Sequence, residues 1–239
     1  MYTASAIPLS TPEQRERTFF LVMALAIAST VIAGFSAYFA HGNSSFHSPW
    51  WVHLHAVSFV SWITLFALQN SLVYRDKIAD HRKLGRIGAG LAAWMVLLGI
   101  AVTPASVLTH RVPPFFTAPF FLALDWVNIV FFAGLISAGI ALHKKTDWHR
   151  RLMFCATVCV ITPAIARLLV VTNTMSPLNI TLALQAFVLA GVVFDLGNRG
   201  RLHPAYIIGS LALLVMGPVT GMVAGLAPVI SLASYLSGG

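Results

Sequence analysis

The chain carries one short motif twice, and each copy holds a histidine next to cations. The copies are Asp80-His81-Arg82-Lys83-Leu84 and Asp147-Trp148-His149-Arg150-Arg151-Leu152, each at the start of a long apolar run. Imidazole nitrogens ligate iron, copper, zinc and nickel. If the two runs pack side by side, His81 and His149 face each other at one depth. We predict that this pair ligates a metal ion or a haem b, with Arg82 and Arg150 pairing with propionates.

A local explanation of the motif competes with this prediction. An aspartate just before a helix caps its free N–H groups, and long cationic side chains reach the lipid headgroups. On that view His81 and His149 are solvated residues at a membrane boundary. Neither of these local roles calls for a histidine, however, and the histidine is what the two copies share besides their charges and leucine.

A second group of polar residues falls inside the apolar runs. Asp125 is the only acid far from the basic connections, and His55 and Arg167 lie at a similar depth when counted at about 1.5 Å per residue. A carboxylate in hydrocarbon needs a partner. We expect Arg167 to neutralise Asp125, with His55 and Asn128 hydrogen-bonded beside them. This layer is either a site for a solute or a proton, or an ion pair that fixes helix register.

The remaining reactive residues give weaker signals. Cys155 and Cys159 stand four residues apart on one helix face, which favours a packing role over a disulfide. The other histidines near the outer connections lack carboxylate or thiolate company. No nucleophile elbow, phosphate-binding loop, catalytic carboxylate pair or HExxH motif is present, so nothing indicates hydrolysis or nucleotide-driven chemistry.

Membrane-spanning helices must position these residues. The chain is 58% hydrophobic and 9% charged, unlike a soluble domain. A bilayer core needs roughly 20 apolar residues per helix. Such runs lie at about 18–40, 51–74, 86–107, 117–142, 152–172, 178–195 and 203–230. We therefore predict an all-α fold, in which residues 1–239 form a single transmembrane domain of seven helices.

The distribution of charge predicts the orientation. Of the 15 Lys and Arg, 13 precede the first run or fall in the connections 2–3, 4–5 and 6–7. The positive-inside rule then puts the N-terminus in the cytoplasm and the C-terminus outside, as in a bacterial inner membrane. The net charge of +8 is divided among short loops, which indicates contact with the lipid bilayer and no nucleic acid.

The duplicated motif also predicts how the helices are arranged. Spans 2–5 would form a pseudo-symmetric four-helix core of two hairpins, with spans 1, 6 and 7 around it. Thr11-Pro12-Glu13-Gln14 reads as a capping box that starts the first helix. Gly217, Gly221 and Gly225 predict a helix-packing seam. We expect the tail after Pro228 to be disordered.

The order of these motifs resembles a bacterial family of multi-pass membrane proteins whose function is unknown. The resemblance covers residues 50–170 and lies in an HR-x-LG turn, an intramembrane Asp, an HR-x-LM turn and an Arg. The chain is more loosely similar to transmembrane b-type cytochromes, in which facing histidines ligate haem. That likeness implies electron transfer. The chain departs from the cytochrome pattern because His81 and His149 lie at helix ends and not within the apolar helices.

Three functions follow from these observations. The first is a membrane redox protein with haem or metal on His81 and His149, exchanging electrons with quinone or another membrane protein. The second is a proton-coupled transporter or carrier that uses His55, Asp125, Asn128 and Arg167. The third is a non-catalytic subunit or assembly factor of a membrane complex. We favour the first, because helix packing alone does not call for the duplicated histidine.

Overall fold

The structure is a computed structural model that describes residues 11–238, and over that range it is built of helices joined by loops. The helices are α1 Pro12–Ala40, α2 Trp50–Tyr74, α3 Ile78–Leu108, α4 Ala118–Ala141, α5 Thr146–Val160, α6 Thr162–Val171, α7 Pro177–Arg199, α8 Pro204–Ala224 and α9 Ala227–Ser237. Six are long and apolar enough to cross a membrane, and α5 with α6 makes a seventh span bent by 42°. The predicted all-α fold with seven membrane spans is thus confirmed, and the chain is an integral membrane protein.

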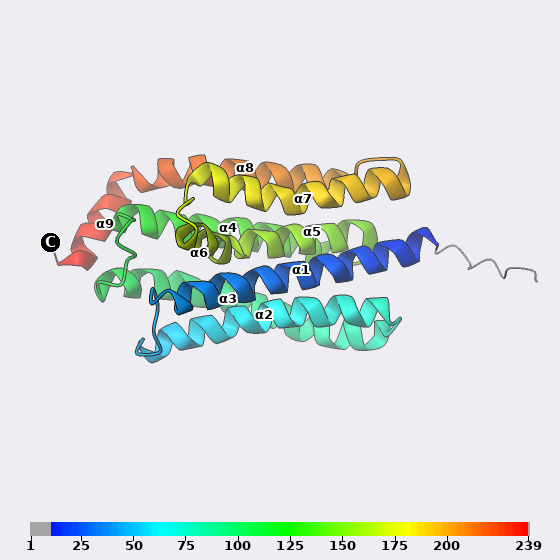
Figure 1. The fold of residues 1–239 in the computed structure, drawn as a ribbon, viewed down its shortest axis with the longest axis horizontal. Coiled ribbons are helices and arrows are strands. Elements are labelled where there is room, and N and C mark those ends of the chain that lie inside the picture. The colour runs from blue at the N-terminus through cyan, green and yellow to red at the C-terminus, as the bar shows by residue number, and fades with distance from the viewer. Residues whose placement is uncertain (1–10, 239) are drawn as a thin grey trace, which may run out of the picture.

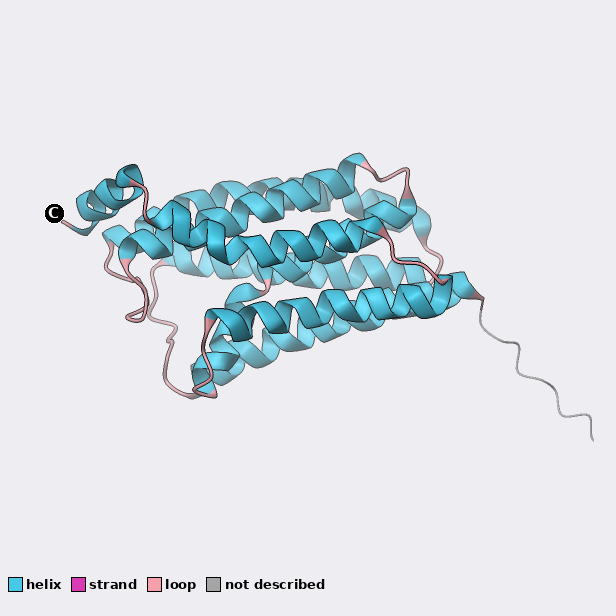
Figure 2. Cartoon of the chain, turned by 90° about the horizontal axis from the view of Figure 1, so that it is seen from above, coloured by secondary structure: helices cyan, strands magenta, loops and turns pink. Residues whose placement is uncertain are grey.

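The long helices run roughly parallel to one another and reverse direction at each short loop (Figure 1, Figure 2). We call one end of the bundle the basic end. It holds the start of α1 and the connections α2–α3, α4–α5 and α7–α8. At the other end, which we call the opposite end, lie α6, α9 and the remaining connections.

One helix lies at the centre of the bundle. The helices α1, α2, α3, α4, α8 and α7 contact one another in that order, and α7 returns to α1, so they close a ring. Inside it, α5 packs against α1, α4, α7 and α8, and every residue from Phe154 to Thr162 is buried. The two predicted hairpins are present. The structure adds that α5 occupies the middle of the whole bundle instead of lying beside α2.

The first helix begins where the sequence predicts. The Thr11 side chain accepts a hydrogen bond from the Gln14 N–H at 3.2 Å, and the Thr11 N–H donates to the Gln14 side chain at 2.9 Å. This reciprocal pair satisfies two N–H groups that the first turn leaves free. The predicted capping box is therefore confirmed.

One prediction about the C-terminal part is wrong, and the predicted glycine seam has no partner helix among the described residues. The tail is not disordered, because α9 continues to Ser237 and buries Val229 and Ala233 against α3 and α4. The glycine seam does not pack within the chain either. A Cβ atom at Gly217 or Gly221 would meet no described atom within 4 Å, so this face of α8 points outward. The spacing of the glycines predicts a helix face without side chains, but it does not predict whether that face points into the bundle or outward.

Candidate functional site

The structure brings the two motif histidines together at the basic end. His81 lies in the first turn of α3 and His149 in the first turn of α5. Their ring centroids are 6.3 Å apart and their planes are inclined by 80°. The side chains come from different hairpins, so the pair exists only when α3 and α5 are correctly placed. Both side chains are partly buried.

A main-chain carbonyl holds His149 in one tautomer. Its Nδ1 lies 2.8 Å from the carbonyl oxygen of Gly139 in α4. A carbonyl oxygen only accepts hydrogen bonds, so Nδ1 carries the proton in the neutral ring and Nε2 keeps its lone pair. Histidines that bind metals commonly donate their second N–H to a carbonyl in this way. His149 is therefore prepared to act as a ligand through Nε2.

A glutamine from α2 holds His81. The amide of Gln69 satisfies its surroundings when its oxygen accepts from the Gly85 N–H at 2.8 Å and its nitrogen donates to the His81 carbonyl at 3.1 Å and to Nδ1 of His81. In this arrangement the neutral His81 ring carries its proton on Nε2. To ligate through Nε2, His81 must move that proton to Nδ1, and the Gln69 amide must turn so that its oxygen accepts it.

The two arginines predicted to pair with haem propionates differ in their availability. Arg82 is exposed. Arg150 is already paired, with its Nη1 at 2.9 Å from Glu16 Oε2 and its Nη2 at 3.4 Å from Asp147 Oδ1. A propionate would have to compete with two carboxylates for the Arg150 guanidinium.

Comparison of the chain with protein families, with curated proteins and with solved structures found no match. What the site does must therefore be inferred from its own chemistry.

Sequence reasoning missed a buried network of charges beside the histidine pair. Arg151, which the local explanation of the motif would place at the headgroups, is fully buried and bound to Asp195 of α7 and Glu16 of α1. Arg199 joins the network, with its Nη2 at 2.6 Å from Glu16 and its guanidinium at 3.0 Å from both Asp147 oxygens. The one available signal was that Glu16 and Asp195 lie at the basic ends of their helices, the same end as Arg151.

The predicted ion pair between Arg167 and Asp125 is wrong, because the described structure contains no contact between them within 4.0 Å. The Arg167 guanidinium lies over the rings of Phe35 and Tyr38 at 4.3 and 5.3 Å, and it donates to the Pro163 carbonyl at 2.9 Å. Asp125 has one long contact, to the Thr103 hydroxyl at 3.3 Å, and the single proton of that hydroxyl is shared with the Gly99 carbonyl at 2.8 Å. Two charges inside the bundle thus lack an ionic partner.

His55 points inward, but the hydrogen bond predicted for it beside Asp125 and Arg167 is absent from the described structure. Its ring stacks on Phe59 with centroids 4.3 Å apart, and its buried Nδ1 has no hydrogen bond to any described residue. Buried polar atoms almost always find a partner, so an orphan of this kind indicates a missing water, ligand or ion.

Asn128 does not join this layer, so that prediction is wrong. Its amide donates to the carbonyl of Cys159 at 3.2 Å, and the Thr162 hydroxyl donates to the same oxygen at 2.8 Å. Pro163 lacks the N–H that would otherwise bond to this carbonyl, four residues earlier in the helix. Asn128 therefore stabilises the break between α5 and α6.

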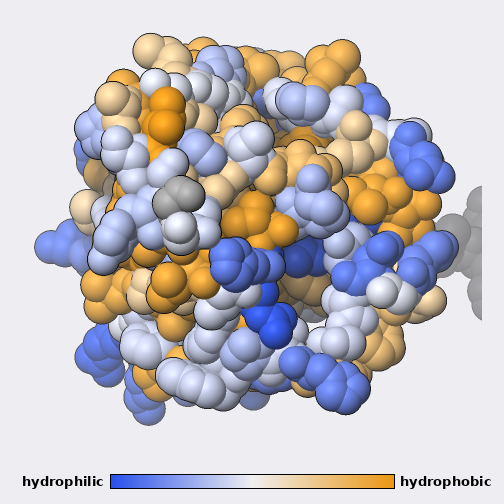
Figure 3. Space-filling view, turned by 90° about the vertical axis from the view of Figure 1, so that its left-hand side faces the viewer, coloured by the Kyte–Doolittle hydropathy of each residue, from blue (hydrophilic) through white to orange (hydrophobic). Residues whose placement is uncertain are grey.

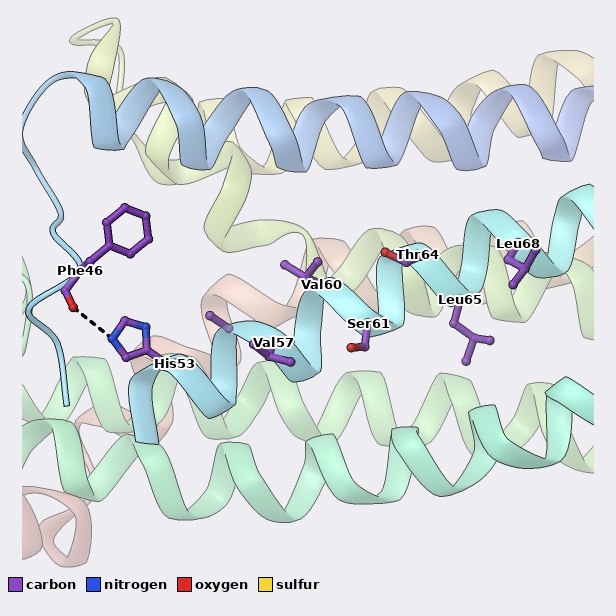
Figure 4. A pocket seen from close by; sticks show the side chains of 9 residues that line it. Phe46, His53, Val57, Val60, Ser61, Thr64, Leu65 and Leu68 are labelled. Carbon is purple, nitrogen blue, oxygen red and sulfur yellow. Dashed lines mark hydrogen bonds between the residues drawn. The ribbon is translucent and has the colours of Figure 1, made fainter. Parts of the chain in front are cut away.

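The remaining candidate residues do not form a cluster that could serve as a site. Within residues 11–238 no three His, Cys, Asp or Glu side chains form a metal-binding group. Cys155 and Cys159 are buried free thiols. The His53 ring bonds to the Phe46 carbonyl at 3.2 Å, at the mouth of a mostly apolar groove along α2 (Figure 4). A groove of this composition on an outer helix suits a lipid chain.

Proposed function

We propose that the chain is a membrane redox protein in which His81 and His149 hold one transition-metal ion. The distance between the two rings carries this proposal. Two imidazoles on opposite sides of one ion, with metal–nitrogen bonds of about 2.0–2.1 Å, have their centres roughly 6 Å apart, whereas a tetrahedral angle brings them to roughly 5 Å. The observed separation is 6.3 Å. The Gly139 carbonyl behind His149 supplies the second hydrogen bond that metal-binding histidines commonly make.

The ligands favour iron or copper, both of which bind imidazole and change oxidation state. A single ion fits these residues better than a haem b, because Arg150 is engaged by Glu16 and Asp147. Water or an electron partner would fill the remaining coordination positions. We propose a membrane quinone or a second membrane protein as that partner.

The positive-inside rule supports the orientation in which the basic end lies in the cytoplasm of a bacterial cell. The metal would then lie near the inner surface of the inner membrane. A reporter enzyme that is active only outside the cytoplasm, fused after residue 239, should be active in this orientation. An active cytoplasmic reporter at the same position would reverse it.

Metal content and visible spectra test the redox proposal directly. The detergent-purified protein should contain iron or copper, and its spectrum should differ between air-oxidised and dithionite-reduced samples. The double variant His81→Ala, His149→Ala should lose both properties. His143→Ala is the matched control, because His143 is an exposed histidine of the same α4–α5 connection. A Soret band would identify haem, whereas a metal-free protein would refute the proposal.

A carrier is the second candidate function, and the bend of 42° in the central span favours it. Transporters commonly bind their substrates where a spanning helix is broken. Asp125, Arg167 and His55 lie in the half of the bundle that contains this break. Uptake of solutes into liposomes containing the purified protein tests this function, with Asp125→Asn as the variant expected to lose it.

A further inference from the structure

The break in the central span changes which helices the chain packs against at the opposite end of the bundle. Whereas α5 packs against α4 and α8, α6 packs against α1 and α7, so the chain leaves the centre after the break. In Figure 1, α6 lies between α7 and α1. Figure 3 shows this end of the molecule hollowed near its middle, with hydrophilic side chains set below the rim. The hollow lies at the same end of the bundle as α6.

Four polar side chains, which we call the outer polar site, come from four helices of this half. They are His55 of α2, Thr103 of α3, Asp125 of α4 and Arg167 of α6. Thr103 bonds to Asp125, and Asn128, one turn along α4 from Asp125, bonds to Thr162 at the start of α6, so α4 and α6 hold Asp125 and Arg167 at a similar depth. Asp125 and Arg167 are both partly accessible. The site thus presents one negative and one positive group that do not neutralise each other by contact.

Each group has unused hydrogen-bonding capacity. A carboxylate accepts about four hydrogen bonds, and Asp125 accepts a single long one. The Arg167 guanidinium has five N–H donors and gives one to Pro163, while Phe35 and Tyr38 support its face. Nδ1 of His55 has no described partner. A ligand could therefore donate to Asp125 and accept from Arg167 at the same time.

The charge of the site selects the class of ligand. Asp125 and Arg167 sum to zero, so a bound anion or cation would leave one uncompensated charge inside the membrane, which is costly. A molecule with one positive and one negative pole leaves none. We propose that the outer polar site binds a small zwitterion of the α-amino-acid class, with its ammonium group at Asp125 and its carboxylate at Arg167.

This ligand assignment rests on the carrier as the function of the site, and it is independent of the metal at the basic end. Full-length protein in detergent would be titrated with a panel of α-amino acids. Two matched panels would follow, carboxylic acids without the ammonium group and amines without the carboxylate. Thermal unfolding and the fluorescence of Trp126, the neighbour of Asp125, would report binding. We expect only the amino acids to raise the melting temperature and change the fluorescence.

Single substitutions then test whether Asp125 binds the ammonium group and Arg167 the carboxylate group of the ligand. Asp125→Asn and Arg167→Gln should each weaken amino-acid binding by at least about tenfold, and neither breaks an ion pair, so both should fold. His53→Ala, which changes a histidine bonded near the groove of α2, should bind as the wild type does. Equal binding of acids or amines, unchanged binding by Asp125→Asn, or no response to any amino acid would overturn the proposal.

Uptake measurements in liposomes test the carrier function separately from the identity of the ligand. Binding of amino acids without their uptake would refute the carrier but leave the zwitterion site in place. Uptake of a singly charged solute that Asp125→Asn abolishes would leave the carrier in place and overturn the zwitterion as its ligand.

Discussion

Arg151 and Asp195 form a two-pronged ion pair at the basic end, with both side chains fully buried. Nε of Arg151 lies 2.8 Å from one carboxylate oxygen and Nη2 lies 2.6 Å from the other. Nη2 also donates to Glu16 at 2.7 Å. The central helix α5 is thereby tied to α7 and α1 by one guanidinium. Such geometry fixes where α5 sits, and therefore where His149 sits two residues earlier.

Removing one partner of this pair should destabilise the protein strongly. Asp195→Asn leaves the buried Arg151 charge with less compensation, and breaking a buried pair typically costs about 3–5 kcal/mol. The exposed pair of Arg17 with Asp76, 2.8 Å apart, offers a matched control. Asp76→Asn should cost less than about 1 kcal/mol. Unfolding titrations in detergent micelles measure both, and equal losses would contradict a special role for the buried pair.

Asn128 and Pro163 should be energetically coupled. Asn128→Ala removes one donor to the Cys159 carbonyl and leaves the Thr162 hydroxyl as the other, so the loss should be that of one hydrogen bond, about 0.5–1.5 kcal/mol. Pro163→Ala restores an N–H that can bond to this carbonyl, so Asn128→Ala should cost less in that background. A double-mutant cycle on unfolding free energies gives the difference. Additive effects would show that Asn128 does not stabilise the break.

Gly34 and Gly217 should respond oppositely to substitution by alanine. A Cβ at Gly34 would collide with the main-chain carbonyl of Ala164, where α1 crosses α6. Forced contacts in packed interiors cost typically about 1–3 kcal/mol. Gly217 has no described atom within 4 Å of its Cβ position, so Gly217→Ala should be neutral or stabilising. Melting temperatures of the two variants distinguish them, and a neutral Gly34→Ala would contradict the close crossing.

The membrane spans and the start of the first helix could be predicted because each depends on residues that are neighbours in the sequence. Apolar length identifies the spans, and the capping box at Thr11 identifies the start of α1, since both depend on neighbouring residues. The duplicated motif also predicts that His81 and His149 face each other, because a repeat places equal residues at equal depth. What the pair binds stays a prediction, since no ligand group is encoded in its spacing.

Lateral contacts could not be predicted in the same way. Counting residues along each helix places Asp125 and Arg167 at the same depth in the membrane. Whether their side chains touch depends on how each helix is rotated about its own axis. The bend after Val160 turns Arg167 toward Phe35 and Tyr38 of α1. Likewise, the burial of Arg151 depends on acids 135 residues before it and 44 residues after it. Such pairings arise only when the ring of helices closes.

The start of α8 should make stability depend on pH. Nδ1 of His203 accepts a hydrogen bond from the Ala205 N–H at 3.2 Å, and its ring meets Trp148 edge-on at 4.9 Å. Partial burial, and then the positive charge of Arg151, lower the pKa of His203 below its usual 6.5, against the opposing effect of Asp195 and Asp147. Protonation would abolish the cap and put a cation at a helix N-terminus.

The sign of this dependence follows from proton uptake. As the pH falls through about 6.5, the unfolded chain takes up a proton at His203 that the folded protein still excludes. The unfolded state then binds more protons, so this histidine's contribution to stability is present above that pH and is lost below it. His203→Asn keeps a capping side chain but cannot titrate. Unfolding midpoints measured from about pH 7.5 to about pH 5 should therefore fall more steeply for the wild type than for His203→Asn. Two parallel curves would mean that His203 does not contribute.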